Sequence, residues 1–169
     1  QPNRWSCTPT AFAIVLGIDV QDIFIDLGHD GSEKLWPHLS EPNNRRGFHL
    51  QEMIDFCYRN GHAVISFEPR PSISSPGTQE LVSKQAIPNH TPYMHPVEFK
   101  EGTHERMSRI MNGNAGVLTG IGLSGNRHAV AWDGLKIIDP TTGDYLDRER
   151  FSIQYVHLVK KLNFGLDVK

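Results

Sequence analysis

The chain has 169 residues, 38% of them hydrophobic, and a formal net charge of −2. This length is typical of one domain, and the composition supports a packed core and excludes a wholly disordered chain. Without clustered excess Lys and Arg there is no basis for nucleic-acid binding. Two cysteines are too few for a disulfide scaffold, although one bridge between Cys7 and Cys57 stays open.

Membrane and export signals are also missing from the sequence. The longest apolar run, Ala11 to Leu16, is far shorter than the roughly 18 residues of a membrane span, and no basic-then-apolar signal segment opens the chain. We therefore expect no membrane association, with the cytoplasm as the favoured location, and leave the oligomeric state open. Because the chain starts at Gln1 rather than at Met, we expect that an upstream segment was removed or left out.

Two helices are predicted before residue 30. The first covers residues 7–16, with Ser6 as N-cap and Gly17 as its end. It is apolar on every face from Ala11 onward, which indicates a buried helix. The second covers residues 20–27 and ends at Gly28.

The third predicted helix, residues 49–59, is the most clearly amphipathic. Leu50, Met53, Ile54 and Cys57 follow the spacing i, i+3, i+4, i+7. We therefore expect Cys57 to be a core residue. Gly61 marks the end of this helix.

The rest of the chain is divided between loops, one helix and several strands. Residues 29–48 are predicted as a loop and residues 69–96 as a long surface excursion over a binding cleft. A helix capped by Thr103 is predicted to run through Met111. Strands are expected over residues 62–68, 115–121, 128–132, 136–138 and 153–159. Helices early and strands late predict a single α+β domain, residues 1–169, with an antiparallel sheet.

Three residues have the pattern that nucleophilic thiol catalysis requires. Cys7 opens the first helix, where the partial positive charge of the N-terminus lowers a thiol pKa. His128 begins a strand, and Asp139 ends the next one. A hairpin about Asp133-Gly134 makes His128 and Asp139 cross-strand neighbours, so a carboxylate can orient the imidazole.

Gln1 stands six positions before Cys7, and the segment from His128 to Pro140 reads His-Ala-Val-Ala-Trp-Asp-Gly-Leu-Lys-Ile-Ile-Asp-Pro. These features resemble papain-like cysteine peptidases, and most closely the bacteriocin-processing peptidases that cut after double-glycine leaders. The resemblance covers residues 1–17 and 116–140. It implies a papain-like fold in which Gln1 supplies an oxyanion-hole donor. Ser6-Cys7-Thr8 replaces the usual Asp-Cys-Gly of that family, so the double-glycine specificity is not implied.

Simpler interpretations compete at several positions. Asp133 is a rival orienter, but its Asp-Gly pair is typical of a hairpin turn. Trp5 and Trp132 either line the cleft or pack in the core. Arg45-Arg46 is interpreted as a solvated charge pair in a loop. Four further residues have the types that ligate metals, and we expect them to be exposed loop residues rather than a metal site: His90, Met94, His95 and His104.

The sequence therefore predicts a cysteine hydrolase that cleaves a peptide or isopeptide bond of a peptide or protein substrate. It would use Cys7, His128, Asp139 and Gln1, form a thioester acyl-enzyme, and need no cofactor. Two alternatives stay open: a glutamine deamidase or acyltransferase with the same triad, and a non-catalytic binding module on the same fold.

Overall fold

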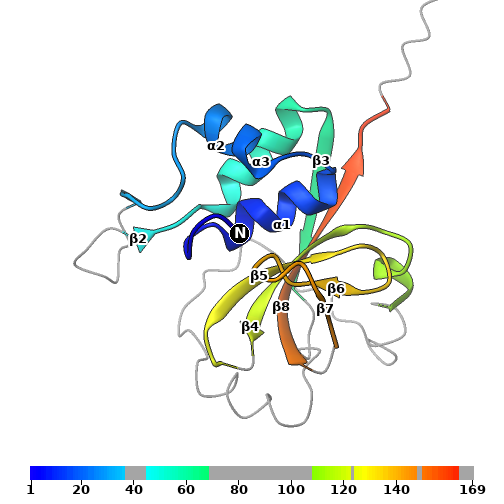
Figure 1. Cartoon of the computed structure of the whole chain (residues 1–169). Helices are drawn as coiled ribbons and strands as arrows, with labels where there is room; N and C mark the ends of the chain where they lie inside the picture. Colours follow the sequence, from blue (N-terminus) through cyan, green and yellow to red (C-terminus); the bar gives the residue numbers. More distant parts are fainter. Residues whose placement is uncertain (37–44, 69–107, 123, 148–149, 164–169) are drawn as a thin grey trace, which may run out of the picture.

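A computed structural model describes residues 1–36, 45–68, 108–122, 124–147 and 150–163. Within this part of the chain, helices gather on one side of a six-stranded antiparallel sheet (Figure 1). The architecture is α+β with an antiparallel sheet, as the order of helices and strands in the sequence predicts.

The helices are α1 (Cys7–Leu16), α2 (Val20–Leu27) and α3 (Leu50–Arg59), close to the predicted ranges. Gly17 and Gly28 end α1 and α2 with φ of 68° and 77°. Glycine adopts this left-handed conformation without a Cβ clash. Among these described helices, none has the length and apolar character needed to cross a bilayer.

The start of α3 differs by one residue from the prediction. His49 is the N-cap rather than the first helical residue, because its Nδ1 accepts a hydrogen bond from the Gln51 N–H and the Glu52 carboxylate accepts one from the His49 N–H. This reciprocal capping box satisfies two of the free donors of the first turn. Asn60 is the C-cap, and Gly61 follows it with φ of 73°.

The large sheet has the strand order β3-β8-β4-β5-β6-β7, and every neighbouring pair is antiparallel. Its strands are β3 (His62–Phe67), β4 (Gly116–Gly122), β5 (Arg127–Trp132), β6 (Ile137–Ile138), β7 (Tyr145–Leu146) and β8 (Phe151–Lys161). The sequence predicts all of these except β7. β7 is as short as β6, but it follows the polar stretch Thr141 to Asp144 and has no apolar run such as Ile137-Ile138 to mark it.

The prediction of a loop over residues 29–48 is wrong in part. β1 (Lys34–Trp36) and β2 (Arg45–Arg46) pair antiparallel in a separate two-stranded sheet. The pairing is backbone hydrogen bonding between two short segments, which leaves no periodic pattern in the sequence. The charge pair Arg45-Arg46 therefore belongs to a strand rather than to a loop.

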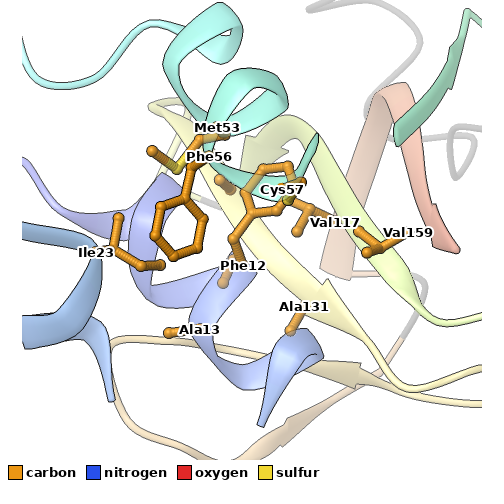
Figure 2. Close-up of a cluster of buried hydrophobic side chains, with 11 residues drawn as sticks. Phe12, Ala13, Ile23, Met53, Phe56, Cys57, Val117, Ala131 and Val159 are labelled. Carbon is orange, nitrogen blue, oxygen red and sulfur yellow. The ribbon is translucent and has the colours of Figure 1, made fainter. Parts of the chain in front are cut away.

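A cluster of buried apolar side chains holds the helices on the sheet. Figure 2 shows Phe12 of α1 among side chains from α2, α3 and the sheet, including Ile23, Phe56 and Val117. Phe12 is fully buried, and truncating such a side chain to Ala typically costs about 3–5 kcal/mol. α1 packs chiefly against β5. The cluster therefore places the beginning of α1 near that strand.

The opposite face of the sheet carries a second cluster. Successive side chains on a strand point to opposite faces, so Val117 belongs to the helix-side cluster while Leu118 belongs to the other one. Trp132 packs in this second cluster, and its Nε1–H donates to the Met111 carbonyl at 3.0 Å. Trp132 is thus a core residue.

Two predictions fall wholly or partly outside the described residues. These are the surface excursion over residues 69–96 and the first part of the helix over residues 103–111. Residues 108–111 are helical.

Candidate active site

Cys7 is the first residue of α1, and its side chain is half-buried. The first turn of that helix contains no acidic residue. The N–H groups of the first turn have no partners inside the helix, so their partial positive charge acts on the sulfur without a compensating carboxylate of the same turn. This arrangement favours the thiolate.

The segment before Cys7 is held by a local turn. Ser6 occupies the N-cap position as predicted, but its side chain makes no capping bond. Instead the buried Ser6 hydroxyl donates to the Asn3 carbonyl at 2.8 Å. The Asn3 side chain accepts a hydrogen bond from the Trp5 N–H at 2.9 Å and donates to the Asp30 carbonyl at 3.0 Å. These bonds fix the direction in which the chain enters α1.

His128 lies near the beginning of β5, directly opposite Gly120 of β4. A Cβ on Gly120 would lie 1.9 Å from the Ser152 carbonyl oxygen, far inside van der Waals contact, so only glycine fits here. β4 and β8 therefore approach closely beside the residue that carries the imidazole, which makes the strand a firm support for it.

The imidazole of His128 donates a hydrogen bond from Nε2 to Oδ1 of Asp139 at 3.1 Å, and the two side chains are 21% and 19% exposed. Because Nε2 is used in this way, Nδ1 is the ring nitrogen left for the thiol of Cys7. The paired residues of β5 and β6 are Ala131 with Ile138 and Trp132 with Ile137. The His128–Asp139 contact is therefore diagonal, rather than directly across the hairpin.

Asp139 is held by the turn that follows β6. Its Oδ1 accepts a hydrogen bond from the Thr141 N–H at 2.8 Å, and its own N–H donates to the Asp144 carbonyl at 2.9 Å. Asp133, the rival orienter, has its Oδ1 occupied by the N–H groups of Leu135 and Lys136. Asp133 thus shapes the hairpin, and Asp139 is the carboxylate beside the imidazole.

The three side chains shift each other's titration. Burial is the largest single influence on the pKa of Cys7, and by itself it would raise that pKa. The hydrogen bond with His128, a hydrogen bond to the backbone of Ala129 and the charge of His128 together outweigh burial. The net pKa of Cys7 is therefore lowered. The pKa of His128 is raised, chiefly by the hydrogen bond with Cys7 and, against burial, also by Asp139. Both shifts favour a thiolate–imidazolium pair.

The pKa of Asp139 is lowered as well. Partial burial is the largest influence and raises it, but the Thr141 N–H and the hydrogen bond and charge of His128 together outweigh burial. Asp139 is therefore ionised at neutral pH and stays a hydrogen-bond acceptor toward the imidazole.

Gln1 lies beside the turn that carries Asp139, because its backbone nitrogen donates to the Pro140 carbonyl. The Oε1 atom of Gln1 is buried and has no hydrogen-bond partner within the described ranges. An amide oxygen only accepts hydrogen bonds, so any donor that Gln1 offers to a ligand must be its Nε2–H groups. The structure thus brings Gln1, Asp139 and His128 into one neighbourhood, with Cys7 coupled to His128.

Two groups at the site were not identified from the sequence. They are the backbone of Ala129, which contributes to the lowered pKa of Cys7, and the Thr141 N–H, which binds Asp139. Every residue except proline has a backbone N–H, so residue type does not reveal which backbone donor takes part in a site. A signal existed only for Thr141, since Asp-Pro-Thr is a turn sequence in which an Asp side chain accepts an N–H two residues on.

The other candidates from the sequence have the following surroundings. Cys57 is fully buried in the helix-side core, as predicted, and both cysteines are free thiols. Trp5 is half-buried with the Arg4 guanidinium 4.2 Å from its ring centroid. The described residues contain no group of three or more His, Cys, Asp or Glu that could hold a metal ion. The four candidates over residues 90–104 lie outside the described residues.

Comparisons with protein-family models, with curated proteins and with solved structures each find no match to this chain.

Proposed function

We propose that this protein is a cysteine hydrolase with a papain-like arrangement of Cys7, His128 and Asp139, and that it cleaves a peptide or isopeptide bond. The observation that carries the proposal is the coupling of Cys7 to His128, which lowers the pKa of the thiol and raises that of the imidazole. Structural cysteines in cores show the opposite shift, since burial alone disfavours a thiolate. Activation of a thiol by an adjacent oriented base is the requirement for nucleophilic catalysis.

The chemistry follows from these positions. The Cys7 thiolate attacks the substrate carbonyl carbon, forming a C–S bond while the carbonyl π electrons move to oxygen. The Cys7 N–H belongs to the first turn of α1, which has free donors, and with the Gln1 side-chain amide it would bind the oxyanion. When the tetrahedral intermediate collapses, the C–N bond breaks and the His128 imidazolium gives its proton to the departing amine.

A water molecule then completes the cycle. Neutral His128 takes a proton from water as the oxygen attacks the thioester carbonyl, the C–S bond breaks, and the acid product leaves Cys7 as thiolate beside imidazolium. Asp139 holds the Nε2–H through the 3.1 Å bond and so presents Nδ1 to the thiol throughout. It acts by positioning the ring and by stabilising its positive charge.

The test uses the wild type, Cys7→Ala and Cys57→Ala on a synthetic peptide library, with products identified by mass spectrometry. We expect cleaved pairs whose masses sum to substrate plus water in the wild type and in Cys57→Ala, but not in Cys7→Ala. Release of ammonia without chain cleavage would assign the site to deamidation instead. Products that persist in Cys7→Ala would contradict the proposal.

A further inference from the structure

A pocket of about 380 Å³ opens beside the His128–Asp139 pair. Its walls come from the beginning of β5, from the turn after β6 and from the residues at the beginning of β8. Cys7 and Gln1 are not among the described residues that line it. The pocket therefore adjoins the imidazole and its orienting carboxylate rather than the thiol.

The walls of this pocket carry an excess of positive charge. Arg127 and Arg150 both line it and both are exposed. The carboxylate of Asp139 is the acidic side chain of the lining, and it is already engaged by His128 and by the Thr141 N–H. In the part of the chain that the structure describes, neither guanidinium has an ion-pair partner.

The remaining lining suits an organic anion with an apolar stem. Phe151 and Leu146 supply apolar surface, and Ser124, Thr141 and Thr142 supply hydroxyl-bearing side chains. Guanidinium groups bind carboxylates through paired N–H donors, and the hydroxyls can donate to the same oxygens. This combination of groups matches a peptide carboxylate.

The position of the pocket indicates which part of a substrate enters it. This step rests on the proposed function, in which His128 protonates the departing amine. The chain attached to that amine must then pass the imidazole. We propose that the pocket between Arg127 and Arg150 binds a carboxylate on the leaving-group side of the scissile bond, either an Asp or Glu side chain or a free C-terminus.

The test measures binding without cleavage, using the Cys7→Ala protein labelled with ¹⁵N. A capped tripeptide with a central aspartate is titrated against its asparagine counterpart, and the backbone amides of Arg127, Thr141 and Thr142 are followed. We expect at least about a ten-fold lower Kd for the aspartate peptide, since charge-assisted bonds to arginine are the stronger kind. Equal Kd values for the two peptides would exclude an Asp or Glu side chain as the bound group, and equal values also for a free C-terminus and its amide would overturn the proposal.

Further variants keep the test falsifiable. Arg127→Gln with Arg150→Gln should abolish the preference for the carboxylate, and Arg127→Lys with Arg150→Lys should retain most of it. The matched control is Lys161→Gln, which removes an exposed positive charge at the opposite end of β8 and should leave the preference intact. A preference that survives in the double Gln variant, or that Lys161→Gln removes to the same extent, would contradict the assignment.

A second pair of peptides separates the two sources of carboxylate. A tripeptide with a free C-terminus is compared with its amide, and whichever pair shows the preference identifies the group that the pocket binds. Carboxylate binding without any Cys7-dependent cleavage would reject the proposed function while leaving the pocket assigned. Cleavage without a carboxylate preference would reject the pocket alone.

Discussion

Two cysteine–histidine pairs of this molecule, Cys7 with His128 and Cys57 with His157, have pKa values that are shifted in opposite directions. Where α1 begins beside β5, the pKa of Cys7 is lowered and that of His128 is raised. In the interior, burial raises the pKa of Cys57 to about 11 and lowers that of His157 to about 4. The first region favours both charged forms, and the second favours both neutral forms.

The difference lies in partners rather than in burial alone. Cys7 is partly buried too, but His128, the Ala129 backbone and the helix N-terminus stabilise its negative charge. His157 is 2% exposed, and its ring nitrogens meet only hydroxyls, those of Ser66 at 2.9 Å and Thr119 at 3.3 Å. A hydroxyl satisfies a neutral imidazole but supplies no countercharge. Burial without a countercharge therefore keeps His157 neutral, whereas their partners keep Cys7 and His128 charged in spite of burial.

The largest expected effect separates the two cysteines. Cys7→Ala should lower peptide cleavage by at least about 10³-fold, because Cys7 is the nucleophile of the proposed mechanism. Its free energy of unfolding should change little. Cys57→Ser should instead place a hydroxyl in the apolar core and lower that free energy by about 1–3 kcal/mol, with activity per folded molecule unchanged. Urea unfolding and kcat/KM of both variants check this, and a loss of activity in Cys57→Ser alone would reverse the assignment.

The next effect concerns the buried histidine. Unfolded His157 takes up a proton near pH 6.5, whereas the folded protein resists protonation until about pH 4. Acidification between these values therefore favours unfolding. The contribution of His157 to stability is complete above pH 6.5 and falls by about 3 kcal/mol as the pH drops to 4.

The measurement is urea unfolding of wild type and His157→Gln at several pH values. The difference in free energy of unfolding between the two proteins should shrink from pH 6.5 to pH 4. Taking this difference removes the contribution of the other titrating groups, which both proteins share. A difference that is independent of pH would contradict the account of His157.

A smaller effect is expected from Asp139→Asn, which should lower kcat by about 10–100-fold while Cys7 remains reactive. Asp139 raises the pKa of His128, so its replacement should let the imidazolium lose its proton at a lower pH. The alkaline side of the pH–rate profile should therefore move to lower pH. Asp133→Asn is the control, since Asp133 accepts bonds only within the hairpin. The same pH shift in Asp133→Asn would count against Asp139 as the orienter.

The sequence predicts the contact between His128 and Asp139 better than it predicts the short strands. Cys7 at the beginning of an apolar helix and His128 at the beginning of a strand are local signals, and the Asp-Gly turn at residue 133 specifies how Asp139 returns toward His128. By contrast, β1, β2 and β7 have two or three residues each, and backbone pairing rather than side-chain pattern defines them.

The pocket beside His128 shows a second limit of sequence analysis. Arg127 begins β5 and Arg150 directly precedes β8, 23 positions later in the sequence. No local sequence pattern therefore indicates that the two side chains line the same pocket. Only the sheet order, in which β5 and β8 both pair with β4, brings their ends to one place. Long-range register, which decides such neighbours, is not contained in any short window of residues.

The most direct test of the central claim is the pH dependence of alkylation by iodoacetamide, followed at Cys7 and Cys57 by mass spectrometry. In the wild type, Cys7 should react with a midpoint below the ordinary thiol pKa, while buried Cys57 stays unmodified. His128→Ala should move the Cys7 midpoint upward and slow its alkylation at pH 6 by at least about ten-fold. An unchanged midpoint in His128→Ala, or equal alkylation of the two cysteines, would contradict the account.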